Sequence, residues 1–161
     1  MPGVEIERKW LVLDAPAEAL AAPSEQIDQG YLTVGANDAE TRLRRRGEKC
    51  SLTVKSGSGM KRAEHEIELT ADQFEALWPA TEGARLIKRR YLVPGEDGHT
   101  IELDVYEDAL AGLIVAEVEF DDPWGAESFV APYWFGQEVT DDSGYRNQRL
   151  ALEGRPAPMS P

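Results

Sequence analysis

Two glutamates and a lysine alternate along the chain close to its N-terminus. Glu5, Glu7 and Lys9 lie in residues 4–12, a segment rich in the β-branched and aromatic residues that favour strands. Successive side chains of a strand point to opposite faces, so these three share one face. Paired carboxylates are hard oxygen ligands that suit Mg²⁺ or Mn²⁺, and a lysine can bind a phosphate oxygen. From this segment alone, an ordinary solvated strand face is an equal alternative.

The same alternation of charged residues recurs in segment after segment. By position in each segment, the basic members are Arg42, Arg44, Lys55, Arg62, Lys88 and Arg90. The acidic members are Glu64, Glu66, Glu68, Glu102, Asp104, Glu117 and Glu119. The two signs are separated by segment, because Arg42 and Arg44 share one strand whereas Glu117 and Glu119 share another.

Two folds explain this alternation. The opposite positions are apolar in several segments, as at Ile101, Leu103 and Val118. In a β-sandwich these would face the core and the charged set would face water. A solvated face usually mixes charge signs along each strand, however, so the separation favours a closed barrel with a charged interior. Helices such as the one that carries Phe74 and Trp78 would then cover its apolar exterior.

A basic wall that faces an acidic wall has a clear chemical use. Arginine forks and lysines can clamp a chain of phosphates, while the carboxylates bind a divalent metal that also binds phosphate oxygens. The sequence therefore predicts a site for a metal–polyphosphate complex. No EF-hand loop, Walker A motif or Gly-x-Ser-x-Gly motif is present, and two histidines leave little scope for histidine catalysis.

The elements that would position these residues follow from periodicity and turn signals. We expect a mainly β (α+β) fold, an antiparallel closed β-barrel with a few surface helices. Thr70 and Gln73 predict a capping box that begins a helix, and Pro79 ends that helix. Helical pieces are expected within 124–139 and after 140–144. The expected strands are residues 4–12, 26–34, 40–46, 49–56, 62–69, 84–93, 100–107 and 112–121.

Composition limits the class of protein. A chain of 161 residues predicts one domain, here residues 1–153, followed by a disordered tail, residues 154–161. A net charge of −13 argues against nucleic-acid partners. A single cysteine, no long apolar run and a polar N-terminus predict a cytoplasmic protein without a membrane partner. A small-molecule polyphosphate is the expected partner, and a homodimer stays open.

The ordered series of motifs resembles the CYTH family, the triphosphate tunnel metalloenzymes. The matching segments are Glu5-x-Glu7-x-Lys9, Thr41-Arg42-Leu43-Arg44, Leu52-Thr53-Val54-Lys55, Glu66-Ile67-Glu68, Lys88-Arg89-Arg90-Tyr91, Glu102-Leu103-Asp104-Val105-Tyr106 and Glu117-Val118-Glu119-Phe120. Tyr145-x-Asn147 is similar to the closing segment of the family. The resemblance implies an eight-stranded antiparallel barrel that forms a tunnel, and hydrolysis or transfer at a triphosphate with Mg²⁺ or Mn²⁺.

The short single-domain bacterial-type members, which are most similar to this chain, imply hydrolysis of inorganic triphosphate to diphosphate and phosphate. A class IV-type adenylate cyclase, a thiamine or nucleoside triphosphatase, and a non-catalytic triphosphate-binding or polyphosphate-binding module are the alternatives. Glu117 and Glu119 are expected to hold one metal, with Asp104 a further metal candidate. By resemblance, Glu5 and Glu7 would hold a second metal or orient the attacking water. Lys9 would bind a phosphate oxygen or the leaving oxygen, or polarise the water.

The remaining site residues divide by charge. The expected substrate-binding set is Arg42, Arg44, Lys55, Arg62, Lys88 and Arg90. Further candidates for the tunnel face are Glu64, Glu66, Glu68 and Glu102.

Overall fold

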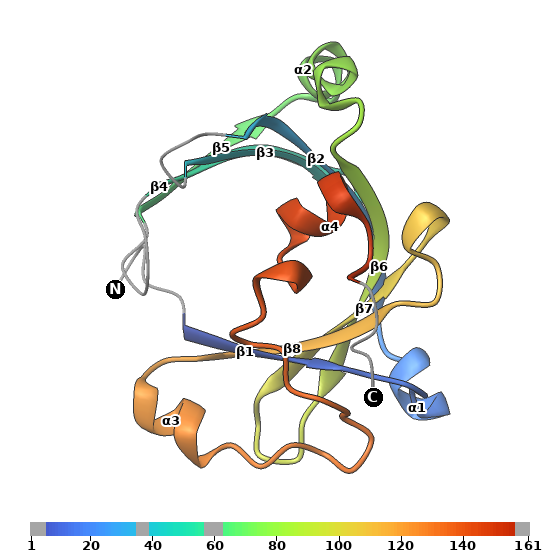
Figure 1. Cartoon of the computed structure of the whole chain (residues 1–161), viewed down its shortest axis with the longest axis vertical. Coiled ribbons are helices and arrows are strands. Elements are labelled where there is room, and N and C mark those ends of the chain that lie inside the picture. The colour runs from blue at the N-terminus through green and yellow to red at the C-terminus, as the bar shows by residue number, and fades with distance from the viewer. Residues whose placement is uncertain (1–5, 35–38, 57–62, 157–161) are drawn as a thin grey trace.

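An antiparallel sheet of eight strands forms most of the molecule. The computed structural model describes residues 6–34, 39–56 and 63–156. The strand order across the sheet is β1-β8-β7-β6-β2-β3-β4-β5. Figure 1 shows that the sheet curves around a central space that holds the last helix. The strands are β1 (Ile6–Leu11), β2 (Ser24–Val34), β3 (Glu40–Arg46), β4 (Lys49–Ser56), β5 (Ala63–Leu69), β6 (Arg85–Pro94), β7 (Thr100–Tyr106) and β8 (Ile114–Phe120).

The antiparallel sheet confirms the expected fold class, while its closure into a barrel stays a prediction. In the described part of the chain, the pairing ends at β1 on one side and at β5 on the other. The outer edge of β1 is covered by a later segment, because Val139 N donates to Lys9 O at 2.8 Å and Leu11 N donates to Gln137 O at 2.8 Å. A bridge between Trp10 and Glu138 continues this pairing.

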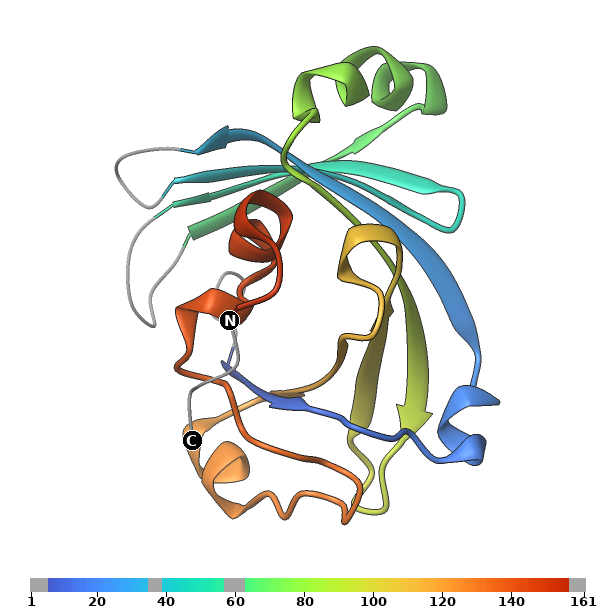
Figure 2. The ribbon, with the colours of Figure 1, turned by 45° about the vertical axis from the view of Figure 1, so that its right-hand side comes forward.

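The convex side of the sheet carries the apolar residues, as the alternation predicts. Leu103 and Val118 are fully buried there beneath the segment that follows β8. Helix α2 (Ala71–Leu77) covers β3 and β4, with Phe74 packed between Leu43 and Cys50. Figure 2 shows α2 on the convex side and the C-terminal helix on the concave side. The convex face thus carries much of the apolar core. The concave face carries the charged side chains and, beside them, a second apolar cluster in which Leu86, Tyr106 and Val115 pack with Leu150 of the C-terminal helix (Figure 2).

The helical cover is less complete than the sequence predicts. Val54 and Ile67, on the convex side of β4 and β5, are 39% and 57% exposed. Leu77 is 36% exposed although its spacing places it with the apolar residues of α2. The helix is short and ends at Leu77, so its apolar cluster reaches Leu69 at the end of β5 but leaves Val54 and Ile67 exposed. A 3₁₀ turn, η1 (Trp78–Thr81), continues the chain from that point.

The other helices are short. They are α1 (Ala17–Leu20), α3 (Pro123–Ser128) and α4 (Asn147–Glu153), together with the 3₁₀ turns η2 (Asp108–Leu110) and η3 (Ser143–Tyr145). In the described residues, no helix combines the length and the apolar character needed to cross a membrane.

The helical pieces expected near 124–139 and after 140–144 are confirmed as α3 and as η3 with α4. The expected tail is described only as far as Pro156, so its disorder stays a prediction, as does the single-domain boundary.

The capping box at the start of α2 forms as predicted. The Thr70 hydroxyl accepts from Gln73 N at 3.1 Å, and the Gln73 side chain accepts from Thr70 N at 2.8 Å. These two bonds satisfy backbone donors that the first turn of a helix leaves unpaired. Phe74 follows directly and stacks on Trp78, with ring centroids 5.0 Å apart. The cap therefore fixes the point from which α2 packs onto the sheet.

Replacing this cap tests how far α2 supports the convex face. Thr70→Ala removes the hydroxyl acceptor and should lower the free energy of unfolding by about 1 kcal/mol. The expected fall in Tm is roughly 2–4 °C for a chain of this size, measured by thermal denaturation. Thr70→Ser keeps the acceptor and serves as the matched control. A Tm for Thr70→Ala equal to that of Thr70→Ser would show that the hydroxyl contributes nothing.

Candidate active site

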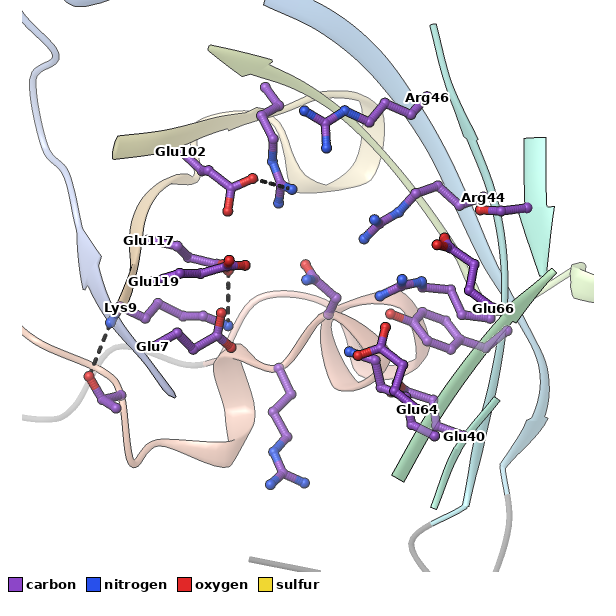
Figure 3. A pocket seen from close by; sticks show the side chains of 18 of the residues that line it. Glu7, Lys9, Glu40, Arg44, Arg46, Glu64, Glu66, Glu102, Glu117 and Glu119 are labelled. Carbon is purple, nitrogen blue, oxygen red and sulfur yellow. Dashed lines mark hydrogen bonds and ion pairs between the residues drawn. The ribbon is translucent and has the colours of Figure 1, made fainter. Parts of the chain in front are cut away.

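The concave side of the sheet encloses a charged cavity of about 740 Å³. This volume lies within the range of ordinary small-molecule sites. Figure 3 shows Glu7, Glu117 and Glu119 on one side, with Arg44 and Arg46 on the other. The acidic lining residues are Glu7, Glu25, Glu40, Glu64, Glu66, Glu102, Glu117, Glu119 and Asp142. The basic lining residues are Lys9, Arg42, Arg44, Arg46, Lys49, Lys55, Arg90 and Arg146.

Most of the residues chosen from the sequence meet at this cavity. Lys88 and Asp104 do not line it and lie fully buried behind its wall. Glu68 belongs to the same face of β5 as Glu66 but is not among the lining residues. Glu5 and Arg62 lie outside the described residues, so their predicted roles remain predictions. The predicted residues that do line the cavity are Glu7, Lys9, Arg42, Arg44, Lys55, Glu64, Glu66, Arg90, Glu102, Glu117 and Glu119.

A buried ion cluster joins β6 to β7 behind the cavity. Asp104 accepts from Lys88 Nζ at 2.8 Å and from Arg90 Nε and Nη2 at 2.8 and 2.9 Å. Arg90 also donates to Glu102 at 2.8 Å, at the cavity wall. Arg90 and Asp104 stand opposite each other in the register of the two strands. The strand pairing thus brings opposite charges together where water cannot compensate them.

The pKa values in this cluster show which charges the site holds. Burial opposes ionisation of Asp104, but Lys88 and Arg90 outweigh it and hold the pKa of this carboxyl well below its usual range. Burial lowers the pKa of Lys88 to about 8, although Asp104 opposes the change. The geometry makes Asp104 the counter-ion of two cations, so we leave it out of the proposed metal ligands.

The acidic wall is built by β1 and β8. In their register Lys9 stands opposite Glu117, and Glu7 stands opposite Glu119. The Lys9 ammonium lies 3.4 Å from the Glu117 carboxylate and donates to Tyr145 O at 3.1 Å. Burial alone would raise the pKa of Glu117, yet Lys9, with Lys88 and Arg90, holds it below the usual value. Glu117 is therefore an anion facing the cavity.

The basic wall holds arginines whose charges are incompletely balanced within the chain. Arg42 is only 7% exposed, and its Nε has no hydrogen-bond partner among the described residues. Arg44 donates to Gln29 Oε1 at 3.0 Å. Burial, together with the like charges of Arg42 and Arg90, lowers the pKa of Arg44 to about 10. Guanidinium groups arranged in this way fit the oxygens of a multiply charged anion.

Several polar residues at the site were not identified from the sequence as site residues. Gln29 links Arg44 to Tyr31, whose hydroxyl accepts from Gln29 Nε2 at 2.7 Å. Asn147 Oδ1 accepts from the Tyr106 hydroxyl at 2.6 Å and lies 3.5 Å from Lys88 Nζ. Alternation in β2 could have placed Gln29 and Tyr31 on one face. The position of Asn147 depends on how α4 enters the concave side, which no local pattern reports.

Comparisons with known proteins agree with this geometry. No family model matches the chain. An inorganic triphosphatase of Nitrosomonas europaea is 47% identical over 149 residues, which is 92% of this chain and 97% of that protein. An inorganic triphosphatase of Acetivibrio thermocellus is 35% identical over 150 residues, 92% of this chain and 93% of that protein. The chain belongs to the inorganic triphosphatase family. A crystal structure of an inorganic triphosphatase superposes with a TM-score of 0.74 at 42% identity, covering 94% of this chain and 97% of that one.

The donor atoms of this family member fit a divalent cation shared with a ligand. Within residues 6–34, 39–56 and 63–156, no group of three or more His, Cys, Asp or Glu is arranged to hold a metal alone. Mg²⁺ is usually bound by one or two carboxylates together with substrate phosphates and water, so a protein cage of three ligands is not required. Glu7, Glu117 and Glu119 supply such carboxylates on one wall of the cavity.

The dependence of Lys88 on Asp104 gives a direct test of the buried cluster. Asp104→Asn removes the charge that raises the pKa of Lys88, so this pKa should fall below its value of about 8. The titration of ¹³C-labelled lysine side chains measures it by NMR, with Lys88→Met identifying the signal. Glu102→Gln, which removes a carboxylate that contacts Arg90 instead, should change the pKa of Lys88 less. An unchanged or higher pKa in Asp104→Asn would contradict the pairing.

Proposed function

We propose that this chain hydrolyses inorganic triphosphate to diphosphate and phosphate with Mg²⁺ or Mn²⁺, as a CYTH-type triphosphate tunnel metalloenzyme. The observation that carries the proposal is one cavity with an acidic wall from β1 and β8 and a basic wall from β3, β4 and β6. The relative at 47% identity, which is named as an inorganic triphosphatase, supports the same substrate.

The basic wall would hold the triphosphate. Arg42, Arg44 and Arg90 are cations that repel one another across the cavity, and a polyanion would relieve that repulsion. The planar guanidinium groups of Arg42 and Arg44 can each bind two phosphate oxygens, whereas Arg90 already pairs with Asp104 and Glu102. Lys55 and Arg46 extend the basic lining beyond these three residues. Binding would therefore use charge and oxygen geometry, which a linear triphosphate supplies throughout its length.

The lining of the cavity favours inorganic triphosphate over a nucleotide. Among the described lining residues, Tyr31 is the only aromatic one. It is 3% exposed and its hydroxyl is bonded to Gln29, so it offers no exposed face for a base. Stacking on aromatic rings is a common way to hold a base, and this cavity lacks a platform for it in the described chain.

The acidic wall would hold the metal. Glu117, Glu119 and Glu7 are the proposed metal ligands. Glu5, which lies outside the described residues, is a further metal ligand expected from the sequence. When bound, the metal would neutralise charge on the phosphate oxygens and on the leaving group. Lys9 makes two described contacts, to Glu117 and Tyr145 O, which leaves one of its three N–H donors for a phosphate oxygen. Positioning and charge neutralisation are the main requirements of phosphoryl transfer, so a histidine base is not needed.

The closed tunnel that the family resemblance implies is part of this proposal. Glu64 and Glu66 lie on β5, at the opposite end of the strand order from β1, yet they line the same cavity as Glu7. Residues 136–139 already bond the edge of β1 at Lys9 and Leu11, so closure would bring β5 toward the rest of β1 and these carboxylates beside the acidic wall. A tunnel would also exclude water from the arginines and so strengthen their hold on phosphate.

A panel of substrates tests the proposed function. Tripolyphosphate, ATP, thiamine triphosphate and longer polyphosphate are each incubated with the protein and Mg²⁺ or Mn²⁺, and released phosphate is measured. We expect tripolyphosphate to have the highest kcat/KM and to need the metal. Faster turnover of ATP with cyclic AMP as product would replace the proposal with a cyclase. Tight binding of tripolyphosphate without turnover under any metal would indicate a binding module.

Removing one carboxylate tests the acidic wall. Glu119→Gln keeps the size of the side chain but removes its charge, and should lower metal-dependent kcat at least about a hundredfold, the scale of losing one electrostatic stabiliser. Asp121→Asn is the control, because Asp121 is exposed just beyond β8 and does not line the cavity. Both variants should keep the wild-type Tm. Equal kcat in folded Glu119→Gln and wild type would remove Glu119 from the metal site.

A further inference from the structure

Arg8 lies on the opposite face of β1 from the cavity and joins three segments of the chain. Its guanidinium binds Glu138 through Nε at 2.9 Å and through Nη2 at 2.7 Å. Its Nη1 donates to Ala126 O at 2.8 Å, within α3. The guanidinium carbon also lies 4.8 Å from the centre of the Trp10 ring. Arg8 therefore fastens residues 136–147, here named the C-terminal arm, to the outside of β1.

The arm reaches Lys9 directly from this point of attachment. The Thr140 hydroxyl donates to Glu138 Oε2 at 2.6 Å, so the carboxylate that Arg8 holds also orients this hydroxyl. Thr140 Oγ1 in turn accepts from Lys9 N at 3.0 Å, while Val139 N donates to Lys9 O at 2.8 Å. Both backbone groups of Lys9 are thus bonded to the arm. Lys9 and Glu117 consequently form the closer kind of antiparallel pair, without backbone bonds between them.

The arm also holds the end of the Lys9 side chain. Beyond Thr140 the chain turns into the concave side, where Tyr145 O accepts from Lys9 Nζ at 3.1 Å. The other described partner of Nζ is Glu117, at 3.4 Å. If the arm moved away, the ammonium would lose its carbonyl partner and shift toward the Glu117 carboxylate. That shift would take Lys9 away from a substrate phosphate and engage a carboxylate proposed as a metal ligand.

We propose that Arg8 is a positioning residue for Lys9, acting through its forked ion pair with Glu138 and through the C-terminal arm. This inference rests on the proposed function, which gives Lys9 a contact with phosphate. The ion pair is partly exposed, with side-chain exposures of 24% and 38%, so it should contribute little to overall stability. Its effect should instead appear in kcat, because a small displacement of a catalytic group costs far more rate than stability.

Kinetics of Arg8 and Glu138 variants form the first part of the test. Arg8→Met and Glu138→Gln should each lower kcat for tripolyphosphate by about 10- to 100-fold and change KM by less than about threefold. Arg8→Lys keeps the charge but cannot form the fork, so its kcat should lie between those of Arg8→Met and wild type. In a Lys9→Ala background, Arg8→Met should cause no further loss of kcat. An equal loss in both backgrounds would overturn the proposal.

Arg45 provides a matched control on the same side of the sheet. It pairs with Asp28 at 2.8 Å and Glu75 at 2.7 Å, and it lies 4.7 Å from the centre of the Phe74 ring. It thus resembles Arg8 in its contacts but fastens α2 rather than the C-terminal arm. Arg45→Met should lower Tm at least as much as Arg8→Met does, with kcat unchanged. If Arg45→Met lowered kcat as much as Arg8→Met does, the loss of kcat would not be specific to the arginine that holds the C-terminal arm, and the proposal would be overturned.

A measurement without substrate separates this inference from the proposed function. Lysine labelled with ¹³C at the ε position reports the surroundings of the Lys9 ammonium by NMR, with Lys9→Ala assigning its signal. The Lys9 signal should shift in Arg8→Met and in Glu138→Gln and stay in place in Arg45→Met. If the wild type proved inactive on every triphosphate, the proposed function would fail and this result would still decide the positioning. An unshifted Lys9 signal in both folded variants would overturn it.

Discussion

The buried contact of Asp104 with Lys88 and Arg90 is the interaction on which the arrangement of the site depends. Isolated charges in a protein interior are strongly unfavourable, so each of these three groups requires the others. The cluster joins β6, which carries the basic residues Lys88 and Arg90, to β7, which carries the acidic residue Asp104. Arg90 then extends toward the basic wall and Glu102 marks the start of the acidic wall, so the pairing of two strands orients both halves of the cavity.

Charge at the site is balanced on one wall and unbalanced on the other. Glu117 has Lys9 beside it, and Asp104 has two cations. Arg42 and Arg44 instead face each other's charge with only neutral hydrogen-bond partners, Thr53 and Gln29, among the described contacts. In a chain whose net charge is −13, Arg42 and Arg44 thus form a local positive region within a cavity that acidic side chains also line. A polyanion bound at these arginines should stabilise the fold.

The two ends of the chain meet at Lys9. β1 supplies this residue, and the segment after α3 returns to bond its backbone and its side chain. The site is therefore complete only when the C-terminal arm has docked, although the arm contributes few residues to the core. Segments of this kind often open more readily than the sheet beneath them. Arg8 and Glu138 attach the arm to β1 on the face opposite the cavity. They thus hold Lys9 in position without adding a buried charge to the cavity.

The sequence alone was enough to assign side chains to faces, because strand alternation is a local property with a period of two residues. It correctly paired Arg42 with Arg44 and Glu117 with Glu119, and it located α2 from the capping box at Thr70. It did not reveal depth along a strand. Lys88 shares the face of Arg90 but is buried beneath Asn147, which comes from a helix 59 positions further along the chain. The sheet's curvature, the entry of α4 into the concave side and the reach of Arg8 to Glu138 arise from packing between distant segments. Local periodicity contains no record of such contacts, so only the tertiary structure decided which charged residues line the cavity and which lie behind its wall.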